Sequence, residues 1–526
     1  MSKPFYITTA IDYVNGQPHL GHAYEKILTD VIARARRSLG EPVFFLTGLD
    51  EHGQKVQQAA LRENKAPQTY CDELAADWKS FTGALHLTND DFVRTTESRH
   101  KQTVQAILAK LHAAGQFYQA EYRGFYSQKE ETFLTEKDRQ PDGKFDPSYG
   151  EVVELVENNY YFKLKDHQQW LVDYIEANPE FIQPDYRRNE VLGFLKNNTL
   201  EDLCITRPAA RLNWGIPLPF DPAYVTYVWF DALVNYISVP AALGDAILTA
   251  ALPNLKLETQ NSQLALWPAD AHVIGKDILK FHAVYWPIML KAMGLPLPKQ
   301  LLVHGWWQKD GAKISKSTGN IVEPLKVIAE WGVDAFRYYV VRELSIGPDG
   351  NWTDDGFKVR YDSELANGLG NLLNRSLSML KKYRNGIVPK PSDSQKEGTA
   401  LVDVDDIPRI EADLRAHQLQ DALVKIWEIV TRANQYIQRT EPFKMAKVPE
   451  KAAELDAVLY NLVETCRVLA VLLWPFIPGT SEKIYAQLGL KDSPAKFSEA
   501  AWGKLAAGHA ISEPAALFPR KDLVPK

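Results

Sequence analysis

A strand, a polar turn and a helix are predicted to follow one another at the start of the chain, and this order constrains the fold most. The apolar and aromatic run 5–9 is typical of a buried strand, and the turn after it contains His19-Leu20-Gly21-His22. From residue 23 to residue 37, apolar side chains recur every three or four positions, which predicts a helix with one face against a sheet. The helix is therefore expected to begin at the two histidines.

This helix start is suited to an anionic ligand such as a phosphate. The first turn of a helix presents backbone N–H groups and the positive end of the dipole. Gly21 would leave room for a flat ring against the backbone. A plain alternative is that His19 and His22 are cap or core residues, and this stretch alone leaves both interpretations open.

Strands and helices alternate through the first part of the chain, which predicts a parallel α/β sheet. A second strand is expected at 43–47, and Asp50, Glu51 and His52 follow it. Ligands of parallel sheets sit beyond the carboxyl ends of strands, so these side chains indicate a buried polar site near the histidines. Helix capping by Asp50 is the alternative.

The pattern changes twice further along. The stretch 118–224 has aromatic, strand-like pieces around polar turns and is predicted to be an inserted domain. The α/β pattern then resumes, with a strand that leads into Gly275, Lys276 and Asp277. The loop 311–319 carries two lysines and two serines between glycines, typical either of a mobile cationic loop that closes on phosphates or of a solvated surface loop.

Beyond residue 360 the chain is predicted to be an antiparallel helix bundle. Apolar stripes cover 365–380, 419–437 and 459–473, and a Pro- and Ser-containing linker is expected at 390–406. The segment 375–390 has five basic residues and no acidic one, which suits either an RNA-facing strip or a solvated face.

Composition excludes several classes of protein. The 526 residues predict several domains, and a formal charge of −6 argues against broad, sequence-independent binding to nucleic acid. The three cysteines are far apart, so neither a disulfide framework nor a thiolate zinc cluster is expected. No export or membrane-spanning segment is predicted, which favours a cytoplasmic location.

Two distant motifs, His19-Leu20-Gly21-His22 and Lys313-Ile314-Ser315-Lys316-Ser317, together resemble those of class I aminoacyl-tRNA synthetases. The detailed resemblance, over essentially the whole chain, is to the methionyl-tRNA synthetases, through 5–22, 44–53, 227–233 and 274–282. It implies a Rossmann-type parallel sheet split by a connective insertion, then a stem-contact fold and an all-α anticodon-binding bundle. The implied boundaries are 1–117 and 225–297 for the catalytic halves, 118–224 for the insertion, 298–360 for the stem-contact fold and 361–526 for the bundle.

The resemblance also assigns residue roles. It implies that His19, His22, Lys313 and Lys316 are catalytic and bind ATP, and that Gly21, Gly275 and Asp277 also bind ATP. The methionine side chain would be held by Ile11, Tyr13, Trp229, Ala232, Tyr236, Ile278 and His282. Asp50 would hold the substrate ammonium with Arg207 as its charge partner, and the anticodon would meet Asn367, Asn371, Arg375, Pro442 and Phe443.

The activity implied is ligation of L-methionine to tRNA(Met), initiator tRNA included, through a methionyl-adenylate formed from ATP with Mg²⁺. Two departures from the family pattern matter. Phe443 stands where Trp is common, and Ser127 and Glu130 stand where zinc ligands fall in many relatives, so no structural zinc is expected. Because the chain stops soon after Phe518, without an appended oligomerising domain, a monomer is expected.

Other functions fit less well. Synthetases for isoleucine, valine or leucine carry a much larger editing insertion, and a cysteine-specific enzyme would need zinc ligands. A non-catalytic RNA-binding paralogue is expected to have lost His22, Asp50 or Lys316, and all three are present. A dinucleotide-dependent oxidoreductase would need a Gly-x-Gly-x-x-Gly turn after the first strand, which the sequence lacks.

Overall fold

The computed structural model describes residues 3–14, 16–127, 132–134, 136–226, 229–255, 264–313, 320–390 and 401–519. The chain forms two compact units. Unit 1 comprises residues 1–17, 44–80 and 89–303, and unit 2 comprises 18–43, 81–88 and 304–526. In the described part of the chain, no helix is long and apolar enough to cross a membrane.

Unit 1 is built on a six-stranded sheet in the order β3-β2-β1-β12-β13-β7. Its strands are β1 (Phe5–Tyr13), β2 (Val43–Asp50), β3 (Asp91–Arg94), β7 (Ile182–Gln183), β12 (Ala271–Gly275) and β13 (Leu301–His304). The pairs β1–β12, β2–β3 and β13–β7 are parallel. The predicted parallel sheet is therefore confirmed, and strands from both sides of the long insertion build it.

Two strands run further than their apolar runs predict. β1 continues from the expected end at residue 9 to Tyr13, and β2 continues from residue 47 to Asp50. Within the predicted runs, the hydroxyls of Thr9 and Thr47 pair with each other at 2.7 Å, which satisfies these two buried polar side chains. Gly48 is required where β2 approaches β3, since a Cβ there would lie 2.1 Å from the carbonyl oxygen of Val93.

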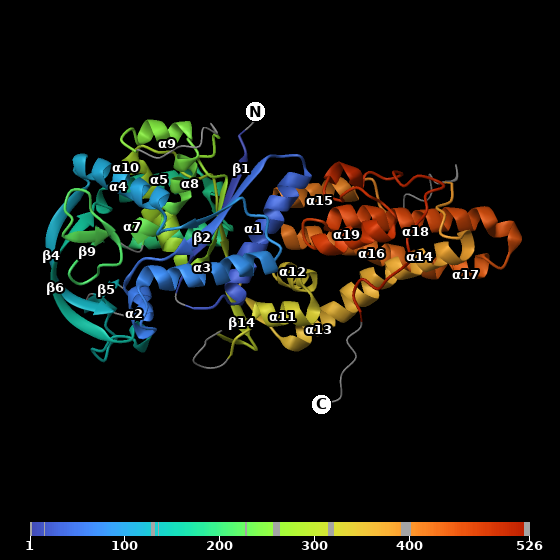
Figure 1. The fold of residues 1–526 in the computed structure, drawn as a ribbon, viewed down its shortest axis with the longest axis horizontal. Helices are drawn as coiled ribbons and strands as arrows, with labels where there is room; N and C mark the ends of the chain where they lie inside the picture. The colour runs from blue at the N-terminus through green and yellow to red at the C-terminus, as the bar shows by residue number, and fades with distance from the viewer. Residues whose placement is uncertain are drawn as a thin grey trace. The chain divides into compact units, whose positions relative to one another are not determined.

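The predicted insertion forms a second, antiparallel sheet in the order β5-β4-β6-β8. Its long ribbon pairs β4 (Phe117–Ser127) with β6 (Val152–Phe162), seen in blue to teal in Figure 1. The other strands of this region are β5 (Thr132–Leu134), β8 (Leu203–Cys204), β9 (Thr206–Pro208), β10 (Ile216–Pro217) and β11 (Tyr224–Thr226). One strand of the same stretch, β7, instead joins the edge of the main sheet through β13.

Most helices of unit 1 pack with this sheet around one large apolar core. They are α4 (Ser98–Ala113), α5 (Gln168–Ala177), α6 (Asp185–Asn197), α7 (Trp229–Ala232), α8 (Asn235–Ala242), α9 (Ala246–Ala251) and α10 (Trp286–Met293). The helix α2 (Gln54–Arg62) instead contributes Val56 and Ala60 to a smaller cluster. α3 (Pro67–Ala84) continues from unit 1 into unit 2.

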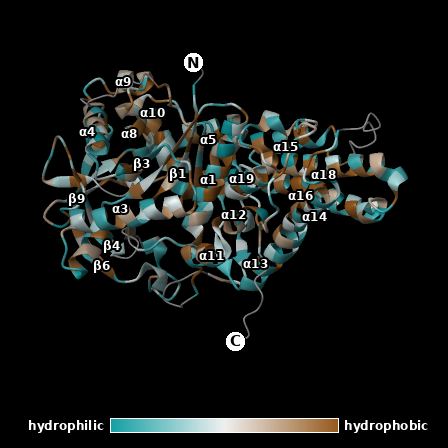
Figure 2. Ribbon diagram, turned by 45° about the vertical axis from the view of Figure 1, so that its right-hand side comes forward, coloured by the Kyte–Doolittle hydropathy of each residue, from teal (hydrophilic) through white to brown (hydrophobic). Residues whose placement is uncertain are grey.

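Unit 2 contains the predicted helix bundle, which is confirmed. α14 (Asn371–Arg384) and α16 (Leu419–Thr440) both pack against α18 (Ala452–Leu473), the orange and red helices of Figure 1. Figure 2 shows hydrophobic and hydrophilic residues sharing these helices, as expected for an apolar stripe on each. The remaining bundle helices are α15 (Asp406–Arg415), α17 (Pro442–Met445) and α19 (Pro478–Gln487).

Before the bundle, unit 2 has a small sheet in the order β15-β14-β16 and three helices. The elements are β14 (Trp307–Lys309), β15 (Ala312–Lys313), β16 (Gly350–Trp352), α11 (Pro324–Trp331), α12 (Val333–Arg342) and α13 (Asp354–Arg360). A π-helical segment, Tyr361–Gly370, leads from α13 into α14.

The helix predicted at the start of the chain, α1 (Leu20–Ser38), belongs to unit 2. Its centre is held by a buried carboxylate, Asp30, which accepts from Arg34 and Arg337, each at 2.8 Å. Burial alone would raise the pKa of Asp30, but the two guanidinium groups outweigh it and lower that pKa. Arg337 also donates to carbonyl oxygens of Leu85, Pro475 and Phe476, so α1 is fixed to the rest of its unit.

Candidate active site

The two histidines at the start of α1 cap the helix through each other. His19 is the N-cap, and its Nδ1 accepts the backbone N–H of Gly21 at 3.1 Å. The Nδ1 of His22 accepts the backbone N–H of His19 at 3.1 Å, and the two rings stack 3.7 Å apart. Because both Nδ1 atoms accept, each neutral ring carries its proton on Nε2. The capping alternative is thus observed, and it orients two N–H donors as a phosphate site would need.

Gly21 packs closely against the ring of His19. A Cβ at this position would lie 3.1 Å from Cε1 of His19, tighter than ordinary van der Waals contact. The glycine therefore makes room for the folded-back ring of its neighbour, and its predicted contact with a ring of the ligand stays a prediction.

The cationic loop lies mostly outside the described residues. The backbone of Lys313 belongs to β15, which pairs with β14. The Lys313 side chain and all of Lys316 are outside the described part of the structure.

In unit 1, predicted site residues gather where strands of the main sheet end. The N–H of Val14, just after β1, donates to the carbonyl oxygen of Asp50 at the end of β2 at 3.1 Å. Asp50 is 6% exposed. β12, the other neighbour of β1, ends at Gly275 and leads into a 3₁₀ turn that holds the exposed Asp277.

A buried hydrogen-bonded pair lies among the residues predicted to hold methionine. Tyr236 Oη lies 2.7 Å from His282 Nε2, and His282 Nδ1 lies 2.9 Å from the carbonyl oxygen of Ile278. A carbonyl oxygen only accepts, so Nδ1 carries the proton in the neutral ring and Tyr236 donates to Nε2. Behind this pair, His272 stacks on Tyr236 with ring centroids 4.1 Å apart, and burial holds the pKa of His272 well below its ordinary value.

Apolar members of the predicted pocket join the same core. Trp229 stacks on Phe281 with ring centroids 3.4 Å apart, and it packs with Ile11 and Ile278 against the cluster that contains Tyr236. Ala232 is 5% exposed. Tyr13 instead packs against a smaller cluster with Val56, and the ammonium of Lys55 lies 5.6 Å from its ring centroid.

The predicted partner of Asp50 makes local contacts. Arg207, on β9, donates to the carbonyl oxygen of Thr206 at 2.7 Å, and its guanidinium lies 5.0 Å from the ring centroid of Tyr126. Pairing of Arg207 with the Asp50 carboxylate stays a prediction.

The segment after Asp50 is fixed by residues that the sequence analysis did not assign to the site. Glu51 accepts from Arg94 at 2.7 Å and from the hydroxyl of Thr96. His52 donates to Asp231 of α7 at 2.6 Å. Burial alone would raise the pKa of Asp231, but His52 and then His100 outweigh it and lower this pKa to about 2. In the sequence, the sign that Asp231 has a special role is that it is a lone acidic residue inside the apolar run that starts at Val225.

Unit 2 has a groove of about 750 Å³ between the helical segment 361–384 and α16. Asn367, Asn371 and Arg375 line it, which brings together three residues of the predicted anticodon site. Further polar side chains on its walls are Arg342, Ser363, Glu364, Glu428, Thr431, Arg432, Asn434, Gln435 and Gln438. Pro442 and Phe443 are not among the described residues that line it. They begin α17, where Phe443 is 43% exposed.

The basic segment after Arg375 is partly engaged within the unit. Lys381 pairs with Glu513, and Arg384 pairs with Asp456 and donates to the carbonyl oxygen of Ala452. These two cations therefore stabilise the bundle itself.

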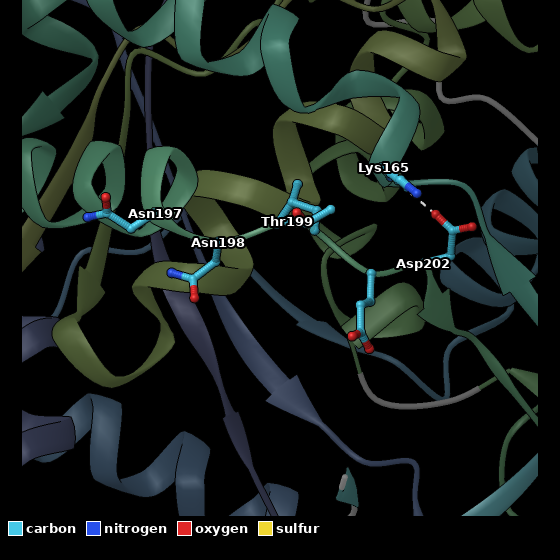
Figure 3. Close-up of a pocket in the computed structure, with 7 residues that line it drawn as sticks. Lys165, Asn197, Asn198, Thr199 and Asp202 are labelled. Atoms are coloured by element: carbon cyan, nitrogen blue, oxygen red, sulfur yellow. Dashed lines mark hydrogen bonds between the residues drawn. The ribbon is translucent and has the colours of Figure 1, made fainter. Parts of the chain in front are cut away.

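A second cavity, of about 520 Å³, lies in the insertion (Figure 3). Its lining is the last residue of α6, Asn197, the loop that follows at 198–202, and Lys165. The Asp202 carboxylate accepts the backbone N–H groups of Leu164 and Lys165, which fixes the shape of this wall.

No group of three or more His, Cys, Asp or Glu residues that could hold a metal is found in the described ranges. Ser127 donates to the carbonyl oxygen of Tyr149, and Glu130 lies outside those ranges. The absence of a structural zinc stays a prediction.

The family model described as tRNA synthetases class I (M) matches residues 5–152 and 148–377. The anticodon binding domain of methionyl tRNA ligase matches residues 388–522. The chain belongs to the methionyl-tRNA synthetase family. It is therefore a methionine–tRNA ligase of class I, which activates methionine and charges tRNA.

Relatives within the methionyl-tRNA synthetase family match over nearly the full chain. The methionine–tRNA ligases of Caldanaerobacter subterraneus subsp. tengcongensis and Bacillus subtilis are each 41% identical over 99% of this chain, covering 80% and 78% of their own lengths. A solved methionyl-tRNA synthetase from Mycobacterium tuberculosis, in complex with methionyl-adenylate, matches with a TM-score of 0.90 and 37% identity. That match covers 99% of this chain and all of the other.

Proposed function

We propose that the chain joins L-methionine to tRNA(Met), initiator tRNA included, by forming methionyl-adenylate from ATP and then transferring the methionyl group to the terminal ribose of the tRNA. The single observation that carries the choice of methionine is the buried Tyr236–His282 pair beside the stacked Trp229 and Phe281.

The pocket of unit 1 suits a thioether. Sulfur against aromatic rings contributes about 0.3 to 1.5 kcal/mol per contact, and Trp229 and Tyr236 offer such rings. The hydroxyl of Tyr236 donates to His282, and we propose that the ring and the oxygen lone pairs of this phenol contact the substrate. A flexible, weakly polar side chain fits these surfaces better than a branched aliphatic or a charged one.

Asp50 is proposed to hold the substrate ammonium. Its side chain is buried at the end of β2, and a buried carboxylate needs a cationic partner. Arg207 is proposed to balance this charge when the ammonium is absent. The substrate carboxylate would then be left to attack the α-phosphorus of ATP.

The histidines are proposed to act on the phosphates. As the methionine carboxylate forms its bond to the α-phosphorus, the bond to the pyrophosphate oxygen breaks and negative charge moves to the leaving group. The Nε2–H donors of His19 and His22 would stabilise that charge, together with Lys313 and Lys316. Gly275 and Asp277 are proposed to hold the adenosine end. Mg²⁺ is proposed to accompany ATP, held mainly by phosphate oxygens and water.

The groove of unit 2 is proposed to read the CAU anticodon. Amide and guanidinium groups of Asn367, Asn371 and Arg375 suit the edges of unstacked bases, and the exposed ring of Phe443, after Pro442, suits stacking. We also propose a cytoplasmic monomer with the five domains predicted from the sequence.

ATP–pyrophosphate exchange across the twenty amino acids tests the activity. The proposal expects exchange with methionine alone, and charging of both elongator and initiator tRNA(Met) transcripts. Exchange driven by a different amino acid would overturn the choice of substrate. Failure to charge initiator transcripts would overturn that part only.

A further inference from the structure

The segment that follows Asp50 is held from several sides. The carbonyl oxygen of Asp50 accepts the backbone N–H of Val14, and the carbonyl oxygen of Glu51 accepts the indole N–H of Trp214. The N–H of Gly53 donates back to the carbonyl of Trp214 at 3.1 Å. Among these contacts, the His52 side chain makes the one that leads to another part of the predicted methionine site.

That contact ends on Asp231, whose carboxylate is fully buried and binds a histidine on each oxygen. His52 Nδ1 donates to Oδ2 at 2.6 Å, and His100 Nε2 donates to Oδ1 at 2.7 Å. His100 Nδ1 in turn lies 3.2 Å from the hydroxyl of Ser238, on α8. Both rings are nearly or fully buried as well. Neither oxygen of Asp231 can therefore turn away without breaking a charged hydrogen bond.

Asp231 stands on α7 between residues proposed to hold the methionine side chain. Trp229 lies two positions before it and Ala232 one position after it. At the other end of the hydrogen bond from Asp231, His52 lies two residues after Asp50, which is proposed to bind the substrate ammonium. The two ends of the amino-acid site are thus joined by one buried His–Asp link across 179 positions of sequence.

We infer that Asp231 is a positioning residue that sets where the ammonium end of the methionine site lies relative to its side-chain end, by fixing His52 to α7. This inference rests on the proposed roles of Asp50 and Trp229. Asp231 itself does not touch substrate in this account. Its effect should therefore fall on methionine recognition and leave the nucleotide unaffected.

Asp231→Asn tests the inference, because the amide keeps the shape but cannot accept from both histidines with full charge. The matched control is Asp245→Asn. Asp245 is another buried carboxylate of unit 1, and in the described ranges its hydrogen bonds come from backbone N–H groups, those of Ile247, Leu248, Leu266 and Trp267. Both variants are expected to lose stability, but only the first should change substrate recognition.

The readout is ATP–pyrophosphate exchange, normalised to the active fraction from adenylate titration. For Asp231→Asn the KM for methionine should rise roughly 10- to 100-fold, the size expected when a binding group loses its support, while the KM for ATP stays within about twofold. Selectivity for methionine over norleucine should fall. Equal KM values for methionine in the Asp231→Asn and Asp245→Asn variants would overturn the inference.

A second pair of variants keeps the test decisive if Asp231→Asn does not fold. His52→Asn places an amide N–H near the position of Nδ1 and should retain most of the methionine affinity, whereas His52→Ala should raise the KM as Asp231→Asn does. Equal KM values in the two His52 variants would contradict the inference. Failure of the wild-type chain to respond to methionine would instead overturn the proposed function.

Discussion

The helix start at His19 and the pocket around Tyr236 reach their geometry by opposite routes. At the helix start, each ring accepts a backbone N–H from a residue two or three positions away. In the pocket, Tyr236 meets His282 across 46 positions, and Asp231 meets His52 across 179. The first is a local backbone device that any chain with these residues can form. The second exists only once the whole of unit 1 has folded.

This difference implies a division of labour. A helix start with two N–H donors recognises phosphate oxygens, which every nucleoside triphosphate shares. A pocket assembled from β1, β2, α7 and the segment around Ile278 can discriminate one side chain from another, because its shape depends on many packed residues. We therefore expect the histidines to accelerate adenylate formation and the pocket to select methionine among the amino acids.

The largest expected effect is at the helix start. His19→Asn retains an N-cap, since Asn is among the preferred cap residues, but removes the ring donor. The rate of adenylate formation should fall roughly 10²- to 10³-fold, as for loss of one preorganised donor, with the KM for methionine unchanged. Pyrophosphate exchange measures the rate and the KM, and a urea titration measures the stability of the variant. If the His19→Asn enzyme were slow and also less stable towards urea than the wild type, the loss of rate would indicate that His19 only caps the helix.

The second-largest effect is expected at Asp50, in the amino-acid site. Asp50→Asn removes the charge proposed to bind the ammonium, and a charged hydrogen bond contributes about 1.5 to 3 kcal/mol. The KM for methionine should therefore rise roughly 10- to 100-fold, while the KM for ATP is unchanged. If ATP binding weakened in parallel, Asp50 would not belong to the amino-acid site.

A third prediction concerns the groove in unit 2. Arg375→Ala should lower the kcat/KM for tRNA charging roughly 5- to 100-fold, as expected for loss of a base-reading arginine. Methionine-dependent pyrophosphate exchange without tRNA should keep its wild-type rate. Lys381→Ala is the matched control, because Lys381 lies on the same helix but pairs with Glu513. Equal losses in the two assays would refute an anticodon role for Arg375.

A smaller effect is expected inside the methionine pocket. Tyr236→Phe keeps the ring and removes the hydroxyl that donates to His282, leaving the buried Nε2 without that donor. A neutral hydrogen bond contributes about 0.5 to 1.5 kcal/mol, so the kcat/KM for methionine should fall roughly 3- to 10-fold. An unchanged kcat/KM would mean that the pair does not shape the pocket.

The smallest effect concerns the far end of α1. Burial, with Arg36 second, lowers the pKa of His417 from 6.5 to about 4, so the folded chain keeps this ring neutral where the unfolded chain protonates it. The stability it contributes is complete above about pH 6.5 and is lost as the pH falls towards 4. His417→Asn, which suits the left-handed backbone at φ 60°, should reduce this loss by about 1 kcal/mol. Urea midpoints at pH 7 and pH 4.5 measure it, and parallel pH curves for the two proteins would contradict it.

The predictable parts of the molecule are those with local causes. The start of α1, the parallel strands and the apolar stripes of the bundle follow from periodicity within a few turns or strands. The exact strand ends did not follow, because pairing with neighbouring strands continues β1 and β2 beyond their apolar runs, to Tyr13 and Asp50. α15 begins at Asp406, where the linker was expected to end, so this helix was not predicted either.

Within the candidate site the same rule holds. His19 and His22 could be found from the turn that contains them, and their mutual capping explains the pattern. Asp231 could not be assigned a role, because nothing near it in sequence reveals that His52 and His100 bind its two oxygens. The resemblance to a family supplied the pocket residues, but not the links that fix them.

A double-mutant cycle between His19→Asn and Tyr236→Phe tests the division of labour most directly. The measured quantity is kcat/KM for methionine in pyrophosphate exchange, for the wild type, both single variants and the double variant. Independent roles predict that the two free-energy losses add to within about 0.5 kcal/mol and that methionine remains the only amino acid activated. A coupling above about 1 kcal/mol, or a change of amino-acid preference caused by His19→Asn alone, would contradict the account.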